Sequence, residues 1–208
     1  MWRYEPLAAP SATFRARGLA YVSAFKWVDT RLAGGREAFQ AAIRPEDRSF
    51  YDQIFVVAGD YEIAPLLRLF VTCARLENEP IEGFIEERAR WSGSSDSKGV
   101  WKPTLHGATP KDVAGRLHSA FNRYFPGCEA HPFESSVDRF TGELVNIPSS
   151  MNGLYAASTA GFYRGALEGA GATNVDLAWE RPKPDGRLDD IPIERLRFVA
   201  TWKITSST

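Results

Sequence analysis

The chain has 208 residues, of which 44% are hydrophobic and 12% aromatic, and its formal net charge at pH 7 is −1. Proteins that bind nucleic acid concentrate Lys and Arg on one face, so this balance argues against a nucleic-acid partner. No run of eighteen apolar residues occurs and no apolar signal segment opens the chain, so we predict a cytoplasmic protein without a membrane span. The apolar content is sufficient for a sizeable core without disulfide bonds or a structural metal ion. Cys73 and Cys128 are therefore predicted to be reduced thiols.

The N-terminal part is predicted to be helical. Apolar residues recur every three or four positions over residues 13–32 and, most clearly, over residues 63–76. Shorter helices are predicted over residues 36–43, from Pro45 to about residue 57, and from Pro80 onward. In the helix after Pro80, the charged residues Glu86, Glu87, Arg88 and Arg90 are predicted to form a solvated outer face.

Residues 91–109 are predicted to be a loop, because residues 92–99 are mostly Ser and Gly. Trp101 within this loop fits either a lid over a pocket or a simple anchor, and the sequence leaves both open. Thr109 and Pro110 then predict the start of a helix that runs to about Tyr124.

The C-terminal third alternates strands with one helix. A hairpin over residues 135–148 is predicted to turn at Thr141-Gly142, and strands over residues 174–180 and 196–204 are joined by a polar turn over residues 182–190. The helix between the two hairpins carries Gly161, Gly165 and Gly169 four residues apart, on one face. Each glycine costs about 1 kcal/mol relative to alanine. We therefore predict that the stripe lets this helix approach another backbone closely, with the helix laid on the second hairpin.

These elements predict an α+β fold in one domain of residues 1–208. A mainly helical part, residues 1–134, packs on a C-terminal four-stranded antiparallel sheet, residues 135–208, and the glycine-striped helix crosses that sheet.

The segment GFYRGALEGAGATNV, residues 161–175, follows a series of helices and precedes the last strands. In this arrangement it resembles the corresponding element of the haem-NO/O2-binding (H-NOX) domains and of the related 4-vinyl-reductase domains. RGLAYVSAFKW at residues 17–27 and FVATW at residues 198–202 are similar to a branch of this superfamily expanded in myxobacteria. The resemblance implies a sensory, ligand-binding domain.

The same resemblance raises the question of haem. A helical histidine coordinates the iron in haem-binding members, and His118 stands at the matching place in HSAFNRYFP, residues 118–126. The family's Tyr-x-Ser-x-Arg signature holds the haem propionates, and the matching stretch here, residues 147–151, keeps only Ser149, with Ile147 and Met151 in place of Tyr and Arg. Without that Arg the propionates lose a charge-assisted partner, so we predict no cofactor. A haem-based gas sensor that uses His118 is the alternative.

We predict a non-catalytic ligand-binding or regulatory module that holds a small apolar molecule, or a protein partner, between the helical part and the sheet. A homodimeric interaction scaffold is a further alternative. Candidate pocket residues are aromatic residues on elements that should converge at this seam: Trp101, Phe121, Tyr124, Tyr155 and Phe162.

Metal binding and catalysis have less support. Cys128 and His131 have metal-ligand spacing, but one pair is half a zinc site, so we predict no metal. No Gly-x-Ser-x-Gly motif occurs and nothing selects a pair of carboxylates, so no catalytic residue is assigned. An enzyme of unknown reaction stays an alternative.

Overall fold

The computed structural model describes residues 1–98 and 108–204. Its helical segments are α1 (Gly18–Arg31), α2 (Gly35–Ala42), η1 (Pro45–Asp47), α3 (Arg48–Tyr51), α4 (Ile63–Glu77), α5 (Ile81–Lys98), α7 (Pro110–Ala114), α8 (Leu117–Tyr124), η2 (Ser149–Met151) and α9 (Asn152–Gly169). Its strands are β1 (Arg15–Arg17), β2 (Asp60–Glu62), β3 (Glu129–Ser135), β4 (Arg139–Pro148), β5 (Ala172–Trp179), β6 (Lys183–Leu188) and β7 (Ile191–Ile204). Within these residues no helix is both long and apolar enough to cross a bilayer.

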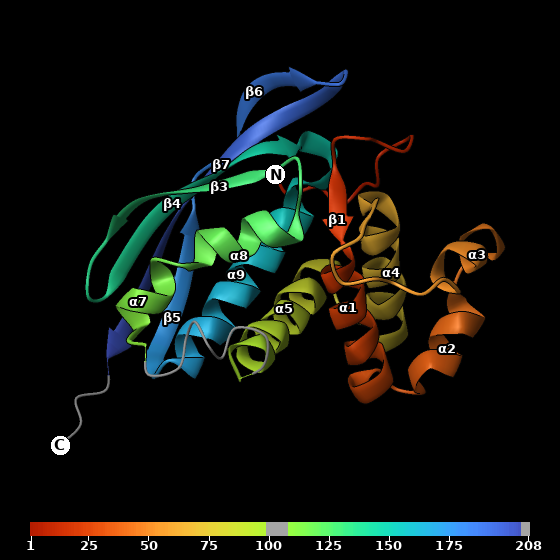
Figure 1. Cartoon of the computed structure of the whole chain (residues 1–208), viewed down its shortest axis with the longest axis horizontal. Coiled ribbons are helices and arrows are strands. Elements are labelled where there is room, and N and C mark those ends of the chain that lie inside the picture. Colours follow the sequence, from red (N-terminus) through yellow and green to blue (C-terminus); the bar gives the residue numbers. More distant parts are fainter. Residues whose placement is uncertain (99–107, 205–208) are drawn as a thin grey trace.

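The elements are arranged side by side. From left to right, Figure 1 shows the large sheet with α8 and α9 beside it, then α5, then α1 and α4, and finally α2 and α3. One hydrophobic core runs through this arrangement, from the inner face of the sheet to the N-terminal helices. The predicted α+β architecture, with a helical part packed on an antiparallel C-terminal sheet, is therefore confirmed.

The sheet has five strands rather than the predicted four. Its order is β3-β4-β7-β5, β6 also pairs with β7, and every pairing is antiparallel. Residues 183–188, which we predict as part of a turn, form β6. Asp189 and Asp190 both have positive φ, 49° and 60°, which allows a tight two-residue hairpin between β6 and β7. Residues 183–188 were not recognised as a strand because they are mostly polar, and the strand that they form lies on an edge of the sheet.

The first hairpin also turns at a different place. Thr141 and Gly142 lie inside β4, and the turn occupies residues 136–138. A Cβ on Gly142 would lie 2.9 Å from the carbonyl oxygen of His131 on the neighbouring strand. This glycine therefore marks a close approach between strands and not a turn.

Several helix boundaries differ from prediction. The first helix begins at Gly18, after β1, and not near residue 13, and the helix predicted from Pro110 to Tyr124 is divided into α7 and α8. The helix that begins near Pro45 ends at Tyr51, whose hydroxyl donates to the carbonyl of Pro65, and the chain then leads into β2. In contrast, α5 continues to residue 98, through part of the segment predicted as a loop. The remaining residues of that segment up to 107, including Trp101 and the lid interpretation, lie outside the described residues.

The glycine stripe of α9 contacts α5. A Cβ on Gly161 would lie 2.0 Å from the carbonyl oxygen of Glu86, and a Cβ on Gly165 would lie 2.0 Å from that of Arg90. The contact is reciprocal, because a Cβ on Gly93 of α5 would lie 2.4 Å from the carbonyl oxygen of Phe162. The two helices therefore touch backbone to backbone.

The stripe thus meets a helix, whereas we predict that it lies on a hairpin. Another side of α9 covers the sheet, as the ring of Tyr163 packs on Phe140 of β4 and Phe198 of β7, with centroids 6.1 and 5.4 Å away. Gly169, the last of the three glycines, is exposed. Glycine spacing identified a close approach but gave no information on the partner.

We predict that the glycine contact is specific and costly to disturb. Gly165→Ala should destabilise the fold by about 1–3 kcal/mol, because the added methyl group would overlap a backbone carbonyl of α5 that cannot rotate away. Gly83→Ala is the matched control, since Gly83 is an exposed glycine of α5 with nothing within 4 Å of its added Cβ. It should leave stability unchanged or raise it by up to about 1 kcal/mol. Urea denaturation measures the free energy of unfolding of both variants, and equal values would contradict the backbone contact between α5 and α9.

Candidate functional site

A small cavity lies where five helices meet between the N-terminal helices and α9. Its volume is about 40 Å³, room for a few water molecules at roughly 10–15 Å³ each on the same measure. The side chains that line it come from α1, α4, α5, α9 and from α8 with the residue that follows it: Ala20, Leu66, Phe70, Arg88, Ala89, Ser92, Phe121, Tyr124, Phe125, Ser158, Thr159, Phe162 and Tyr163.

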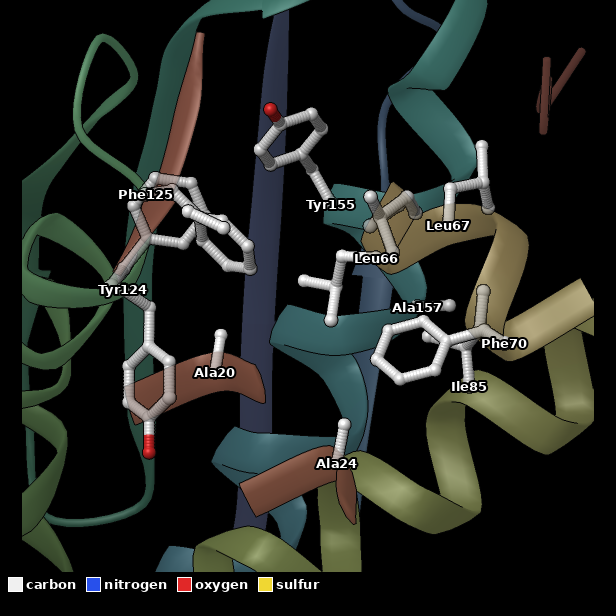
Figure 2. Packing of buried hydrophobic residues seen from close by; sticks show 14 of the residues in the cluster. Ala20, Ala24, Leu66, Leu67, Phe70, Ile85, Tyr124, Phe125, Tyr155 and Ala157 are labelled. Carbon is white, nitrogen blue, oxygen red and sulfur yellow. The ribbon is translucent and has the colours of Figure 1, made fainter. Parts of the chain in front are cut away.

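One part of the wall is apolar. Figure 2 shows Tyr124 and Phe125, at the end of α8, on one side, and Leu66 and Phe70 of α4 on the other, with Ala20 of α1 between them. Aromatic residues of α8 line the wall together because of their spacing. Tyr124 and Phe125 follow Phe121 by three and four residues, so all three share one face.

The other part of the wall carries a buried positive charge. Arg88 of α5 is only 6% exposed, and its guanidinium lies 4.9 Å from the ring centroid of Phe70. Its Nη2 donates to the hydroxyls of Ser23 and Ser92, at 3.0 and 3.2 Å, and these two hydroxyls are 2.9 Å apart. We predict that Arg88 belongs to a solvated face, and the structure places it instead in the cavity wall. Burial of a charge is costly unless the group is paired and hydrogen-bonded, and the guanidinium of Arg88 is hydrogen-bonded here.

Three hydroxyl groups of α9 add unsatisfied polar atoms to the wall. Ser158, Thr159 and Tyr163 line the cavity, are at most 8% exposed, and have no hydrogen-bond partner for their hydroxyl oxygens among the described residues. Leaving a buried polar group unsatisfied costs about 1–3 kcal/mol, so such groups usually mark a bound water or ligand. Burial raises the pKa of Tyr163, which therefore stays a neutral hydroxyl near pH 7.

The structure brings together most of the predicted pocket residues. Phe121, Tyr124 and Phe162 line the cavity. Tyr155 is fully buried behind this wall, with its ring centroid 6.3 Å from Phe121. Trp101 lies outside the described residues.

Sequence reasoning did not select Arg88, Ser92, Ser158 or Thr159. A signal was present for the first two, because Arg88 is four residues after Phe84 and four before Ser92, and so lies on the buried face of α5. Nothing in the sequence distinguishes Ser158 and Thr159 from other hydroxyl residues.

His118 lies close to the cavity without lining it. It is half-buried on α8, one turn before Phe121, and its Nδ1 is buried with no partner among the described residues. Its Nε2 is 3.2 Å from the hydroxyl of Ser119. At the stretch matched to the haem signature, Ile147 and Met151 are fully buried in the core and Ser149 is also buried.

The two cysteines are free and buried. The Cys128 thiol donates to the carbonyl of Asn146 at 3.4 Å, and the rest of its possible metal pair, His131, is 3.1 Å from a carboxylate oxygen of Glu129. Across residues 1–98 and 108–204 no group of three or more His, Cys, Asp and Glu side chains could hold a metal ion.

The fold can be compared with known proteins. No family model matches the sequence, and neither does any curated protein. Among solved structures, an oxygen-binding H-NOX domain related to soluble guanylate cyclases, in its oxygen complex, is 13% identical with a TM-score of 0.65, over 92% of this chain and 97% of that one. The Fe(II) unliganded H-NOX protein from K. algicida is 11% identical with a TM-score of 0.61, over 92% of this chain and 99% of that one.

The chain has an H-NOX-like fold. A third example, a mutant of T. Tengcongensis H-NOX, is 14% identical with a TM-score of 0.60, over 90% of this chain and 97% of that one. The H-NOX resemblance seen in the sequence is thereby confirmed at the level of fold. The likeness to 4-vinyl-reductase domains and to the myxobacterial branch stays a prediction.

The comparison overturns our prediction that the domain has no cofactor. Two other similar H-NOX structures, with TM-scores of 0.63 and 0.62, concern haem redox potential set by porphyrin distortion and haem distortion in this family. That prediction gave decisive weight to the two changes at Ile147 and Met151. Losing one anchoring site is weak evidence, because burial of a large apolar ring contributes more to binding than one surface ion pair.

We predict that neither thiol reacts in the folded protein. Burial raises the pKa of Cys73 and of Cys128 to about 12, so at pH 8 only about one thiol in 10⁴ is the reactive thiolate. A disulfide reagent such as dithionitrobenzoate should therefore modify the native protein very slowly and modify both thiols after unfolding in guanidinium chloride. Rapid modification of either thiol under native conditions would contradict the buried placement.

Proposed function

We propose that this chain is a haem-based sensor domain in which His118 coordinates the iron. The observation that carries the proposal is the Nδ1 of His118, which is buried, has no partner within residues 1–98 and 108–204, and lies one turn from the cavity wall, in a fold whose similar solved structures include haem proteins. Imidazole is a common haem ligand.

The residues present fit haem in donor type and in wall chemistry. His118 supplies the axial donor, and Phe121, Tyr124, Phe125 and Phe162 supply the apolar, aromatic surface that a porphyrin needs. The cavity volume of about 40 Å³ does not fit, because sites for molecules of this kind have volumes of about 300–1,000 Å³. Haem entry therefore requires the helices around the cavity to separate.

The helices differ in how they meet the cavity. Close backbone contact fixes α5 against α9 through Gly161 and Gly165, so these two helices form a common wall. α8 is short, and it meets the cavity through side chains of its last turns. We infer that α8 moves when the cavity opens, which would also bring His118 to the cavity edge.

Haem would supply an iron that can coordinate a diatomic gas. This chain's own residues would hold the ring between apolar walls, exclude water and fix His118 on α8. A shift of α8 would alter the surface of the domain and so pass the signal to a protein partner. In this proposal the domain acts in the cytoplasm and catalyses no reaction itself.

We predict that added haemin gives a Soret band shifted from that of free haemin and that His118→Ala weakens haemin binding by about tenfold or more, because the axial bond is lost. Absorption spectra recorded during a haemin titration measure this. Imidazole added to His118→Gly should restore the spectrum of the original protein.

The control is His131→Ala, which removes a largely exposed histidine of β3 and should leave the titration unchanged. No shifted band, or identical spectra and affinities for the His118→Ala variant and the original protein, would rule out the proposed coordination.

A further inference from the structure

A second hollow lies at the end of the molecule away from the large sheet, where Figure 1 shows α1, α2 and α3. It is an open groove with a volume of about 540 Å³, within the range of about 300–1,000 Å³ found for small-molecule sites. Side chains of α1, α2, α3 and the residues that follow α3 line this groove, and none of them lines the central cavity. The groove is therefore a separate candidate site.

The floor of the groove is aromatic and held in place by other contacts. The ring centroid of Phe25 is 5.7 Å from that of Phe55 and 6.1 Å from that of Tyr51. Phe55 also stacks on the buried ring of Tyr21 at 4.5 Å, and the hydroxyl of Tyr51 donates to the carbonyl of Pro65. Side chains that are already ordered lose little freedom when a ligand binds, so this floor is suited to binding.

An ion pair covers part of the floor. The guanidinium of Arg36 lies 3.9 Å from the ring centroid of Phe25, and its Nε and Nη2 donate to the two carboxylate oxygens of Asp29, each at 2.9 Å. These hydrogen bonds lower the pKa of Asp29, so the pair stays ionised near pH 7. One face of the guanidinium thus meets a ring and one edge meets a carboxylate, yet the side chain is 38% exposed. Its other face can stack on a planar aromatic group.

The groove has an excess of positive charge. Its charged lining residues are Lys26, Asp29 and Arg36, and the last two neutralise each other. Among the described residues, the ammonium of Lys26 has an aromatic partner, the ring of Trp91 at 5.6 Å, and no carboxylate partner. The flexible stem of a lysine lets its ammonium reach an anion nearby. An acidic group on the ligand would therefore complement the groove.

From these contacts we infer that the groove binds a planar aromatic molecule that carries an acidic group. The ring lies against Phe55 and the outer face of Arg36, and the acidic group pairs with Lys26. An aromatic floor alone would accept any apolar molecule. The guanidinium face adds a preference for a flat, electron-rich ring, and the ammonium adds a preference for an acid. This site requires no haem.

Three probes test the two preferences separately. Indole-3-acetate has both features, 3-methylindole lacks the acidic group, and cyclohexylacetate lacks the planar ring. Each is titrated into the full chain, and amide chemical shifts give the affinity and the place of binding. Indole-3-acetate should bind about two- to fivefold more tightly than either of the other probes, because exposed ion pairs and cation–π contacts each contribute modestly. The shifts should centre on Lys26, Arg36 and Phe55.

Two variants assign the preferences to residues. Lys26→Met removes the charge of an exposed side chain and should lower the affinity for indole-3-acetate to that for 3-methylindole. Arg36→Lys keeps the charge without the planar face, and it should weaken binding of both indoles and leave cyclohexylacetate unchanged. Lys203→Met is the matched control, because it makes the same change at an exposed lysine of β7 and should alter no affinity.

Equal affinities for the three probes, or an unchanged preference for the acid in Lys26→Met, would overturn the inference. Shifts that centre on the residues of the central cavity would also overturn it, as would a lack of binding by all three probes. The haemin titration of His118→Ala uses none of the groove residues, so failure of this site would leave the proposed sensor standing, and failure of the sensor would leave the groove standing.

Discussion

The contact between α5 and α9 is the constraint on which the other features depend. Where Gly161 and Gly165 of α9 lack side chains, carbonyl groups of α5 occupy the space that a Cβ would fill. Ion pairs on both sides of the contact, Arg90 with Glu168 and Arg164 with Glu86, join the same two helices. Because α9 also covers the sheet, this contact joins the helical part to the β-sheet part.

The position of the cavity follows from that contact. Where two helices are in backbone contact, only small side chains fit along the line of contact. Side chains of both helices, among them Arg88 and Ser92 on α5 and Ser158 and Thr159 on α9, line the cavity together with side chains of α1, α4 and α8. Polar groups of two helices thus meet aromatic groups of the others, and this gives the cavity its uneven chemistry.

Much of the fold could be predicted from the sequence, because the strongest patterns report burial. The α4 helix, the glycine-rich α9 and the alternation in β7 all combine a clear period with many buried positions. The strand β6 was missed because an edge strand needs little apolar surface, and its residues resemble those of a turn. The continuation of α5 was missed because Ser and Gly suit both a loop and a crowded helix contact, and only the position of α9 decides between them.

The candidate site was predictable only in its apolar half. Phe121, Tyr124 and Phe162 could be selected because aromatic residues on converging elements usually meet. Arg88 was missed despite its spacing from Phe84, because a charged residue among other charged residues on a helix is normally solvated. Its burial depends on which face of α5 the neighbouring helices cover, and that is a property of the tertiary structure.

The smallness of the cavity has a consequence for how such a domain would respond. If the closed form dominates, the observed affinity equals the intrinsic affinity multiplied by the open fraction, so opening in about one molecule in a hundred weakens apparent binding about a hundredfold. Apolar wall residues such as Leu66 would then affect the open fraction, and so the ligand concentration at which the domain is half saturated. Related chains with this architecture could thereby acquire different sensitivities through the stiffness of their walls alone, with the chemistry of recognition left intact.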